Sequence, residues 1–161
     1  MLREIKENDF IVSKTDLTGH ITYVNKIFME MAEYTEEELL GKPHSIIRHK
    51  DMPKAVFKLL WDMVQNREEI FAFVINRTKN NNEYWVYANI TPSFDEHGKL
   101  IGYYSVRRKP NPKAIEILKP VYAAMLSAEK SGGIEAGMKF LTDILTTKGV
   151  SYNEFIIAIQ E

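Results

Sequence analysis

One stretch decides how the chain is organised: Pro43-His44-Ser45-Ile46-Ile47-Arg48-His49-Lys50-Asp51-Met52-Pro53. Pro53 opens a strongly helical segment, where a proline loses no hydrogen bond because its missing N–H would be unpaired in the first turn anyway. Asp51 lies where an acid stabilises the start of a helix. Neither argument accounts for Arg48 and His49 beside two isoleucines. We interpret Arg48 and His49 as the first sign of a ligand site.

Length and composition indicate one soluble domain with an appendage. The chain has 161 residues, of which 45% are hydrophobic, an ordinary fraction for a protein that buries a core. A net charge of −1 argues against nucleic acid or anionic membrane as the main partner. No cysteine is present, which excludes disulfides, thiolate metal sites and a cysteine nucleophile. No signal-peptide pattern opens the chain, and no apolar run approaches the ~20 residues of a membrane span.

Apolar periodicity predicts strands and helices in a definite order. The expected strands are 10–16, 20–25, 69–79, 83–94 and 100–108, and the expected helices between them are 26–33, 35–41 and 53–67. Thr35 and Glu38 form the pattern of a capping box at the start of the second helix. The prediction is an α+β fold, with a five-stranded antiparallel sheet and helices on one face.

Polar and proline-rich segments divide the chain further. The expected parts are an N-terminal arm at 1–9, a main domain at 10–109 and a C-terminal helical segment at 110–161. The linker Lys109-Pro110-Asn111-Pro112 separates the last two, because its prolines cannot join a strand. Beyond it, we expect Pro120 to kink the first helix and Ser131-Gly132-Gly133 to break it.

Several polar and aromatic residues stand where a plain sheet or helix would carry aliphatic side chains. They are Asn25, Arg48, His49, Asp51, Trp61, Asn76, Arg77, Trp85 and Asn89. A side-chain amide donates and accepts at once, so Asn25 and Asn89 could bind a heterocycle. Trp85 could stack on a flat ring, and Arg48 could clamp a phosphate through its fork of N–H donors.

Each of these residues also has a purely structural interpretation. An Asn at a strand end is commonly a turn or cap, both tryptophans could be core packing, and Arg48 with His49 could form a solvated loop face. His44, His49 and Asp51 lack the spacing of a known metal-ligand set, which argues against a metal site. No nucleophile elbow or Gly-rich phosphate loop is present, which argues against a hydrolase.

The order of elements and a set of short motifs carry a family resemblance. The motifs are Thr15-Asp16-Leu17, Ile21-Thr22-Tyr23-Val24-Asn25, Tyr34-Thr35 with Glu38-Leu39, Gly41-Lys42-Pro43-His44, Arg48-His49-Lys50-Asp51-Met52-Pro53, Asn76-Arg77-Thr78-Lys79-Asn80, Tyr84-Trp85-Val86-Tyr87-Ala88-Asn89, Gly102-Tyr103 and Pro120-Val121-Tyr122. Over roughly residues 10–122 the chain resembles a PAS domain, in particular the flavin-binding sensor of bacterial aerotaxis and energy-taxis receptors.

The resemblance implies a non-covalently bound FAD. Carried over by motif, Arg48, His49 and Asp51 are the positions linked with flavin binding in that family. The argument from residue types adds further candidate cofactor-binding residues: Asn25, Trp61, Asn76, Trp85 and Asn89. The blue-light PAS relatives form a cysteinyl-flavin adduct, which a chain without cysteine cannot form.

The resemblance also implies a role in energy taxis and a partner. The sequence ends at Glu161 with neither a membrane span nor a signalling coiled coil, so we expect a free-standing PAS subunit. It would be cytoplasmic, held at the inner face of the membrane by a membrane-bound, HAMP-type chemotaxis transducer. A homodimer is a further option, and the C-terminal helices could pack on the main domain or on the partner. No enzymatic activity is expected.

A redox mechanism follows from a bound flavin. Reduction adds a proton at the flavin N5 atom, which turns an acceptor into a donor. A nearby amide or imidazole, with Asn89 and His49 as candidates, must then reorient, because an unpaired buried polar group costs ~1–3 kcal/mol. Three alternatives stay open: a haem PAS gas sensor with His44 or His49 as axial ligand, a cofactor-free interaction module, and a flavin-dependent enzyme, for which no substrate acid or base is evident.

Overall fold

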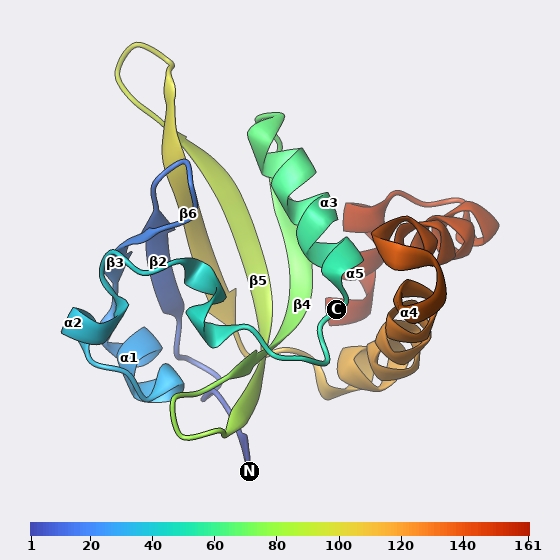
Figure 1. The fold of residues 1–161 in the computed structure, drawn as a ribbon, viewed down its shortest axis with the longest axis horizontal. Helices are drawn as coiled ribbons and strands as arrows, with labels where there is room; N and C mark the ends of the chain where they lie inside the picture. Colours follow the sequence, from blue (N-terminus) through green and yellow to red (C-terminus); the bar gives the residue numbers. More distant parts are fainter.

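A central β-sheet forms the framework of the protein, whose computed structural model describes residues 1–161 (Figure 1). The strands are β1 Leu2–Arg3, β2 Ile11–Thr15, β3 Ile21–Val24, β4 Ile70–Arg77, β5 Glu83–Phe94 and β6 Leu100–Arg108. β5 pairs with β4 and β6, β6 pairs with β2, and β2 pairs with β3, all antiparallel. These are the five strands that the sequence predicts, and the α+β class is confirmed.

Two residues of the N-terminal segment, for which the sequence predicts no strand, pair with the sheet. Leu2 and Arg3 pair parallel with Glu83 and Tyr84 at the start of β5, so the six-stranded sheet is mixed and the prediction of a purely antiparallel sheet is wrong. The guanidinium of Arg3 donates to the carbonyls of Glu30 and Met31 at 2.8 and 2.7 Å. These long-range contacts fix a segment whose polar sequence gives no strand signal.

Both faces of the sheet are apolar, because the paired positions of β4 and β5 alternate between two sets of hydrophobic residues. Val74 opposite Val86 lies on one face, and Ile75 opposite Trp85 lies on the other. A sheet buried on both faces needs cover on both. Helices therefore pack on each side, and not on one face as the sequence predicts.

The first face is covered by the segment between β3 and β4. Its helices are α1 Lys26–Ala32, α2 Glu36–Leu39, the 3-10 helix η1 His44–Ile47 and α3 Lys54–Gln65. The predicted capping box is confirmed, since the Thr35 hydroxyl accepts from the Glu38 amide at 3.2 Å and the Glu38 carboxylate accepts from the Thr35 amide. The helix α3 begins directly after Pro53, as its fixed φ favours.

The opposite face is covered by the C-terminal helices, α4 Pro112–Lys148 and α5 Tyr152–Gln160 (orange to red in Figure 1). The Tyr122 hydroxyl donates to the Phe73 carbonyl at 2.6 Å, and the Tyr122 ring stacks on Trp85 with centroids 6.1 Å apart. The Asn153 side chain accepts from the Phe71 amide of β4 at 3.0 Å. The helical segment thus packs on the main domain and completes its core.

The direction of α4 changes at a glycine. Gly133 has φ 74° and ψ −169°, a backbone conformation that is sterically unfavourable for residues with a Cβ. Pro120, in contrast, keeps helical dihedral angles. The helical break therefore falls at Gly133, as the Ser131-Gly132-Gly133 motif predicts, and the helix continues through Pro120. No helix in the protein is long and apolar enough to cross a membrane.

A carboxylate of α4 connects the two helical layers. Glu129 accepts from the backbone amides of Lys54 and Ala55 at 3.0 Å each, at the start of α3. Pro53 offers no side-chain cap there, so Glu129 acts as the N-cap of α3 from a distant part of the chain. A Cβ at Gly137 would lie 2.8 Å from the Glu129 Cγ, so glycine leaves room for this arrangement.

The remote cap predicts a loss of stability when Glu129 is removed. Glu129→Ala should destabilise the protein by about 1–2 kcal/mol, the usual effect of losing an N-cap. For a protein of this size, thermal unfolding should then move down by roughly 2–8 °C. Glu135→Ala on the exposed side of α4 is the matched control and should leave the transition in place. Equal melting temperatures for both variants would contradict the role of Glu129.

Candidate functional site

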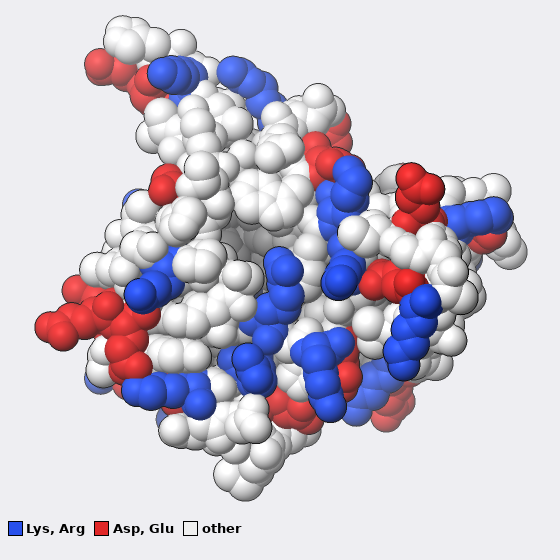
Figure 2. All heavy atoms as spheres, in the orientation of Figure 1, with Lys and Arg blue, Asp and Glu red and all other residues white.

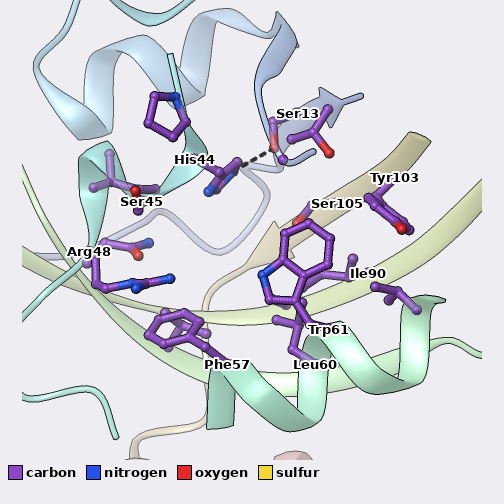
Figure 3. Close-up of a pocket in the computed structure, with 18 of the residues that line it drawn as sticks. Ser13, His44, Ser45, Arg48, Phe57, Leu60, Trp61, Ile90, Tyr103 and Ser105 are labelled. Atoms are coloured by element: carbon purple, nitrogen blue, oxygen red, sulfur yellow. Dashed lines mark hydrogen bonds between the residues drawn. The ribbon is translucent and has the colours of Figure 1, made fainter. Parts of the chain in front are cut away.

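A cavity of about 280 Å³ lies between the first sheet face, η1 and α3. Figure 2 shows this face of the molecule hollowed between α3 and the sheet, with Lys and Arg side chains beside the hollow. The close-up in Figure 3 shows the residues of α3 and η1 facing those of the sheet across this space. The cavity is thus built from segments that lie far apart in the sequence.

One wall of the cavity is the apolar stripe of α3. Phe57, Leu60, Trp61 and Val64 recur at helical spacing and all line the space. They face a second apolar wall on the sheet, formed by Val74, Val86, Ala88 and Ile90. Two such walls enclose a slot whose shape suits a flat, largely apolar group.

Trp61 has a fixed place in the α3 wall. Its ring meets Tyr103 edge to face, with centroids 5.4 Å apart. A Cβ at Gly19 would lie 3.0 Å from the indole, and Gly19 also has φ +84°, so this position favours glycine twice over. Trp61 therefore belongs to the cavity lining as well as to the packing of the domain.

A polar cluster closes one end of the cavity. Arg107 donates through Nε to Ser105 Oγ at 2.9 Å and through Nη2 to Ser13 Oγ and, at 3.1 Å, to His44 Nε2. Because a guanidinium can only donate, His44 Nε2 is the acceptor here and also accepts from the Ser13 hydroxyl at 3.1 Å (Figure 3). Enclosure of the imidazole, with the Arg107 charge beside it, lowers the pKa of His44 to about 3. His44 is therefore neutral at ordinary pH.

A second cation stands at the edge of the cavity. Arg48 ends η1, and its guanidinium lies 4.1 Å from the centroid of the Phe57 ring. Partial burial lowers the pKa of Arg48, which still leaves it charged. An isolated antiparallel bridge joins the Arg48 backbone to Asn76, whose side chain is buried in the cavity wall.

Three of the predicted site residues, Arg48, Trp61 and Asn76, line the cavity. Asn25 does not: it is the N-cap of α1, and its side chain accepts from Phe28 N and Val12 N and donates to Phe10 O. Both hydrogen bonds that the Asn25 amide oxygen accepts come from backbone amides, one in β2 and one in α1. The interpretation of a strand-end Asn as a cap fits this geometry.

His49 and Asp51 lie outside the cavity as well. The His49 imidazole accepts from the Asp51 amide at 3.0 Å and donates through Nε2 to the Glu83 carboxylate at 2.8 Å. Both ring nitrogens are therefore used to fasten the loop to the start of β5. The Asp51 side chain is 60% exposed. The family motif thus shapes the loop, and only its Arg48 reaches the cavity.

Trp85 and Asn89 lie on the other face of the sheet. In β5, Val86 and Ala88 line the cavity, and side chains of a strand alternate between faces. Trp85 stacks on Tyr122 instead, and the Asn89 amide approaches the Ile70 carbonyl at 3.4 Å. A ligand held in the cavity would not contact either residue.

The polar cluster of Ser13, Ser105 and Arg107 was not among the predicted site residues. All three alternate with outward-facing residues along β2 and β6, so they share a face with Tyr103. A polar pair at i and i+2 of an otherwise apolar strand, Ser105 and Arg107, was the available signal. Arg107 stands next to last in the predicted strand, and no local pattern of the sequence indicates that its side chain is buried.

Comparison with known proteins agrees with this architecture. The family model described as the PAS fold matches residues 21–107. The aerotaxis receptor of Escherichia coli is 37% identical over 134 residues, which are 83% of this chain and 26% of the receptor. Phototropin-1A of Oryza sativa subsp. japonica is 24% identical over 102 residues, 63% of this chain and 11% of the phototropin. The chain therefore spans about a quarter of the receptor and about a tenth of the phototropin.

Solved structures show the same fold at low identity. The PAS domain of a protein from Colwellia psychrerythraea has a TM-score of 0.57 at 19% identity, covering 62% of this chain and 85% of that one. The LOV domain of a blue-light activated histidine kinase from Erythrobacter litoralis has a TM-score of 0.55 at 20% identity, covering 62% and 94%. Since the sheet, the helices and a family match over more than half of the sequence agree, the chain belongs to the PAS family.

Proposed function

We propose that this protein is a cytoplasmic redox sensor that holds FAD in the cavity and signals in energy taxis through a membrane-bound transducer. The observation that carries the proposal is the slot between α3 and the sheet, apolar on both walls and cationic at its polar end. The 37% identity to an aerotaxis receptor over most of the chain supports the signalling role. The protein would transmit a signal and not turn over a substrate.

The lining residues fit the ring system of a flavin. The walls of α3 and the sheet would hold the ring faces, with Trp61 supplied by α3 and Ile90 by β5. The volume is near the lower end of the ~300–1,000 Å³ usual for ligand pockets, so the ring would fill it and the remainder of FAD would leave through the opening. Arg48 lies beside the Phe57 ring, where its N–H donors could bind a phosphate.

Asn76 takes the role that the sequence assigned to Asn89. It supplies a buried amide to the cavity, and an amide can offer either its oxygen or its NH₂ group. The bound flavin would supply reversible uptake of electrons and protons. When a ring nitrogen changes from acceptor to donor, rotation of the Asn76 amide would keep the pair satisfied, and failure to rotate would cost ~1–3 kcal/mol.

The path from the cavity to a partner would run through α3. The cavity-lining residues of α3 belong to the same helix as Lys54 and Ala55. The backbone amides of these two residues donate to the Glu129 carboxylate of α4. A shift of α3 would therefore act on α4 and α5, which cover the far face of the sheet. The outer surface of these helices is where we place the contact with the transducer.

The hydrogen bonds of His44 and His49 argue against the haem alternative. His44 Nε2 already accepts from Ser13 and from the Arg107 cation, which would repel a metal ion at that position. His49 uses both ring nitrogens at the start of β5 and does not line the cavity. Neither imidazole is free to serve as an axial ligand in this arrangement.

Absorption spectroscopy of the purified protein tests the cofactor directly. We expect the bands of an oxidised flavin that bleach with dithionite, and release of FAD on heating. The control is the same protein stripped of ligand and reconstituted with FAD. A Soret band would replace the proposal with haem-based sensing. A flat visible spectrum after reconstitution would leave a cofactor-free interaction module.

Paired asparagine variants test where the flavin binds. Asn76→Ala should weaken FAD binding about 2- to 10-fold, the value of one hydrogen bond of about 0.5–1.5 kcal/mol. Asn89→Ala changes the same side chain on the opposite sheet face and should leave FAD affinity unchanged. Titration of the stripped proteins with FAD, followed by flavin fluorescence, measures both. A larger effect at Asn89 would place the flavin outside this cavity.

A further inference from the structure

Arg107 carries a buried charge without a counter-ion. Its side chain is 3% exposed and lines the cavity, yet no Asp or Glu forms an ion pair with it. Burial lowers the pKa of Arg107 to about 10, so the guanidinium remains charged at neutral pH. Charged side chains are almost never buried unless a partner of opposite charge accompanies them.

The groups that do contact Arg107 are all neutral. They are the hydroxyls of Ser13 and Ser105 and the uncharged imidazole of His44. The guanidinium also lies over the Phe28 ring, with 5.1 Å between the Arg107 Cζ atom and the ring centroid. The third nitrogen of the guanidinium, Nη1, is enclosed and has no hydrogen-bond partner in the protein. Arg107 therefore keeps one unpaired donor nitrogen and one uncompensated positive charge.

The one other buried polar group near this cation does not resolve the imbalance. The Tyr84 hydroxyl lies beside the Asn76 side chain, and the Arg107 charge acts to lower the pKa of Tyr84. Burial nevertheless raises the pKa of Tyr84 to about 12, so this phenol is neutral and cannot act as a counter-ion. No side chain of the protein therefore supplies a negative charge to match Arg107.

We propose that Arg107 is the ligand-binding cation of the cavity and that its guanidinium binds the carbonyl edge of the flavin pyrimidine ring. The inference rests on the proposed function. When the ring takes two electrons from a reductant and one proton from water, one negative charge remains, shared by N1 and the adjacent carbonyl. Arg107 would supply the charge that balances it, and would therefore bind reduced flavin more tightly than oxidised flavin.

This role differs from that of Arg48. Arg48 is only partly buried at the edge of the cavity, where a phosphate could reach it in either redox state. Arg107 is enclosed, and charges interact far more strongly where water is excluded. A cation at this position acts on the difference between the two redox states, which is the quantity that a redox sensor must set.

Matched variants on β6 test the proposal. In Arg107→Met the ratio of the dissociation constants for oxidised and reduced FAD should fall at least tenfold, which lowers the two-electron midpoint potential by about 30 mV per tenfold change. Arg107→Lys keeps the charge and should retain most of the parent potential. Arg108→Met is the control, because the neighbouring side chain is exposed and lies over Tyr87 on the opposite face. A parent-like potential in Arg107→Met would overturn the assignment.

Thermal unfolding of the stripped proteins gives an answer that does not depend on flavin. If the role of Arg107 is to bind a ligand, the Arg107→Met variant should melt at the parent temperature or above, because the substitution removes an uncompensated buried charge. If Arg107 is structural, the variant should melt well below Arg108→Met, and the proposal fails. Absence of flavin binding in the parent protein would refute the proposed function, while this measurement would still decide the role of Arg107.

Discussion

The alternation of side chains along β5 is the constraint on which the rest of the structure depends. Val86 and Ala88 face the cavity, and Trp85 and Tyr87 face the C-terminal helices, because successive residues of a strand point to opposite sides. Pairing with β4 and β6 fixes this register from both edges. A slip by one residue would exchange the two sets, place tryptophan and tyrosine in the cavity, and put the smaller valine and alanine against the C-terminal helices.

The helix α3 is the element that the two sides of the protein share. Its apolar stripe forms a cavity wall, while its first turn is capped by Glu129 from α4. The sheet itself separates the cavity from α4 and α5, so α3 and the edge strand β4 are the places where a change at one side can reach the other. Tyr122 of α4 strengthens the connection through β4, because its hydroxyl donates a hydrogen bond to the Phe73 carbonyl.

The electrostatics of the cavity depend on Arg107, a cation whose hydrogen-bond partners are all neutral. Ser13, Ser105 and His44 hold Arg107 by neutral hydrogen bonds, which orient the guanidinium without cancelling it. Enclosure strengthens what the charge does to a nearby ligand and keeps His44 neutral. A carboxylate at any of these positions would neutralise the Arg107 charge within the protein, and Arg107 would then have little electrostatic effect on a bound ligand.

The sequence by itself determined the local elements, because capping boxes, turns and apolar periodicity act within a few residues. It predicted the five main strands, the start of α3 after Pro53 and the break at Gly133. The tertiary structure alone decided which distant residues meet and which face of the sheet each strand residue occupies. Arg107 and Ser13, 94 positions apart, share a hydrogen bond, and the neighbours Trp85 and Val86 lie on opposite faces. Burial and long-range pairing, including that of Leu2–Arg3, arise from the whole chain, and no local pattern encodes them.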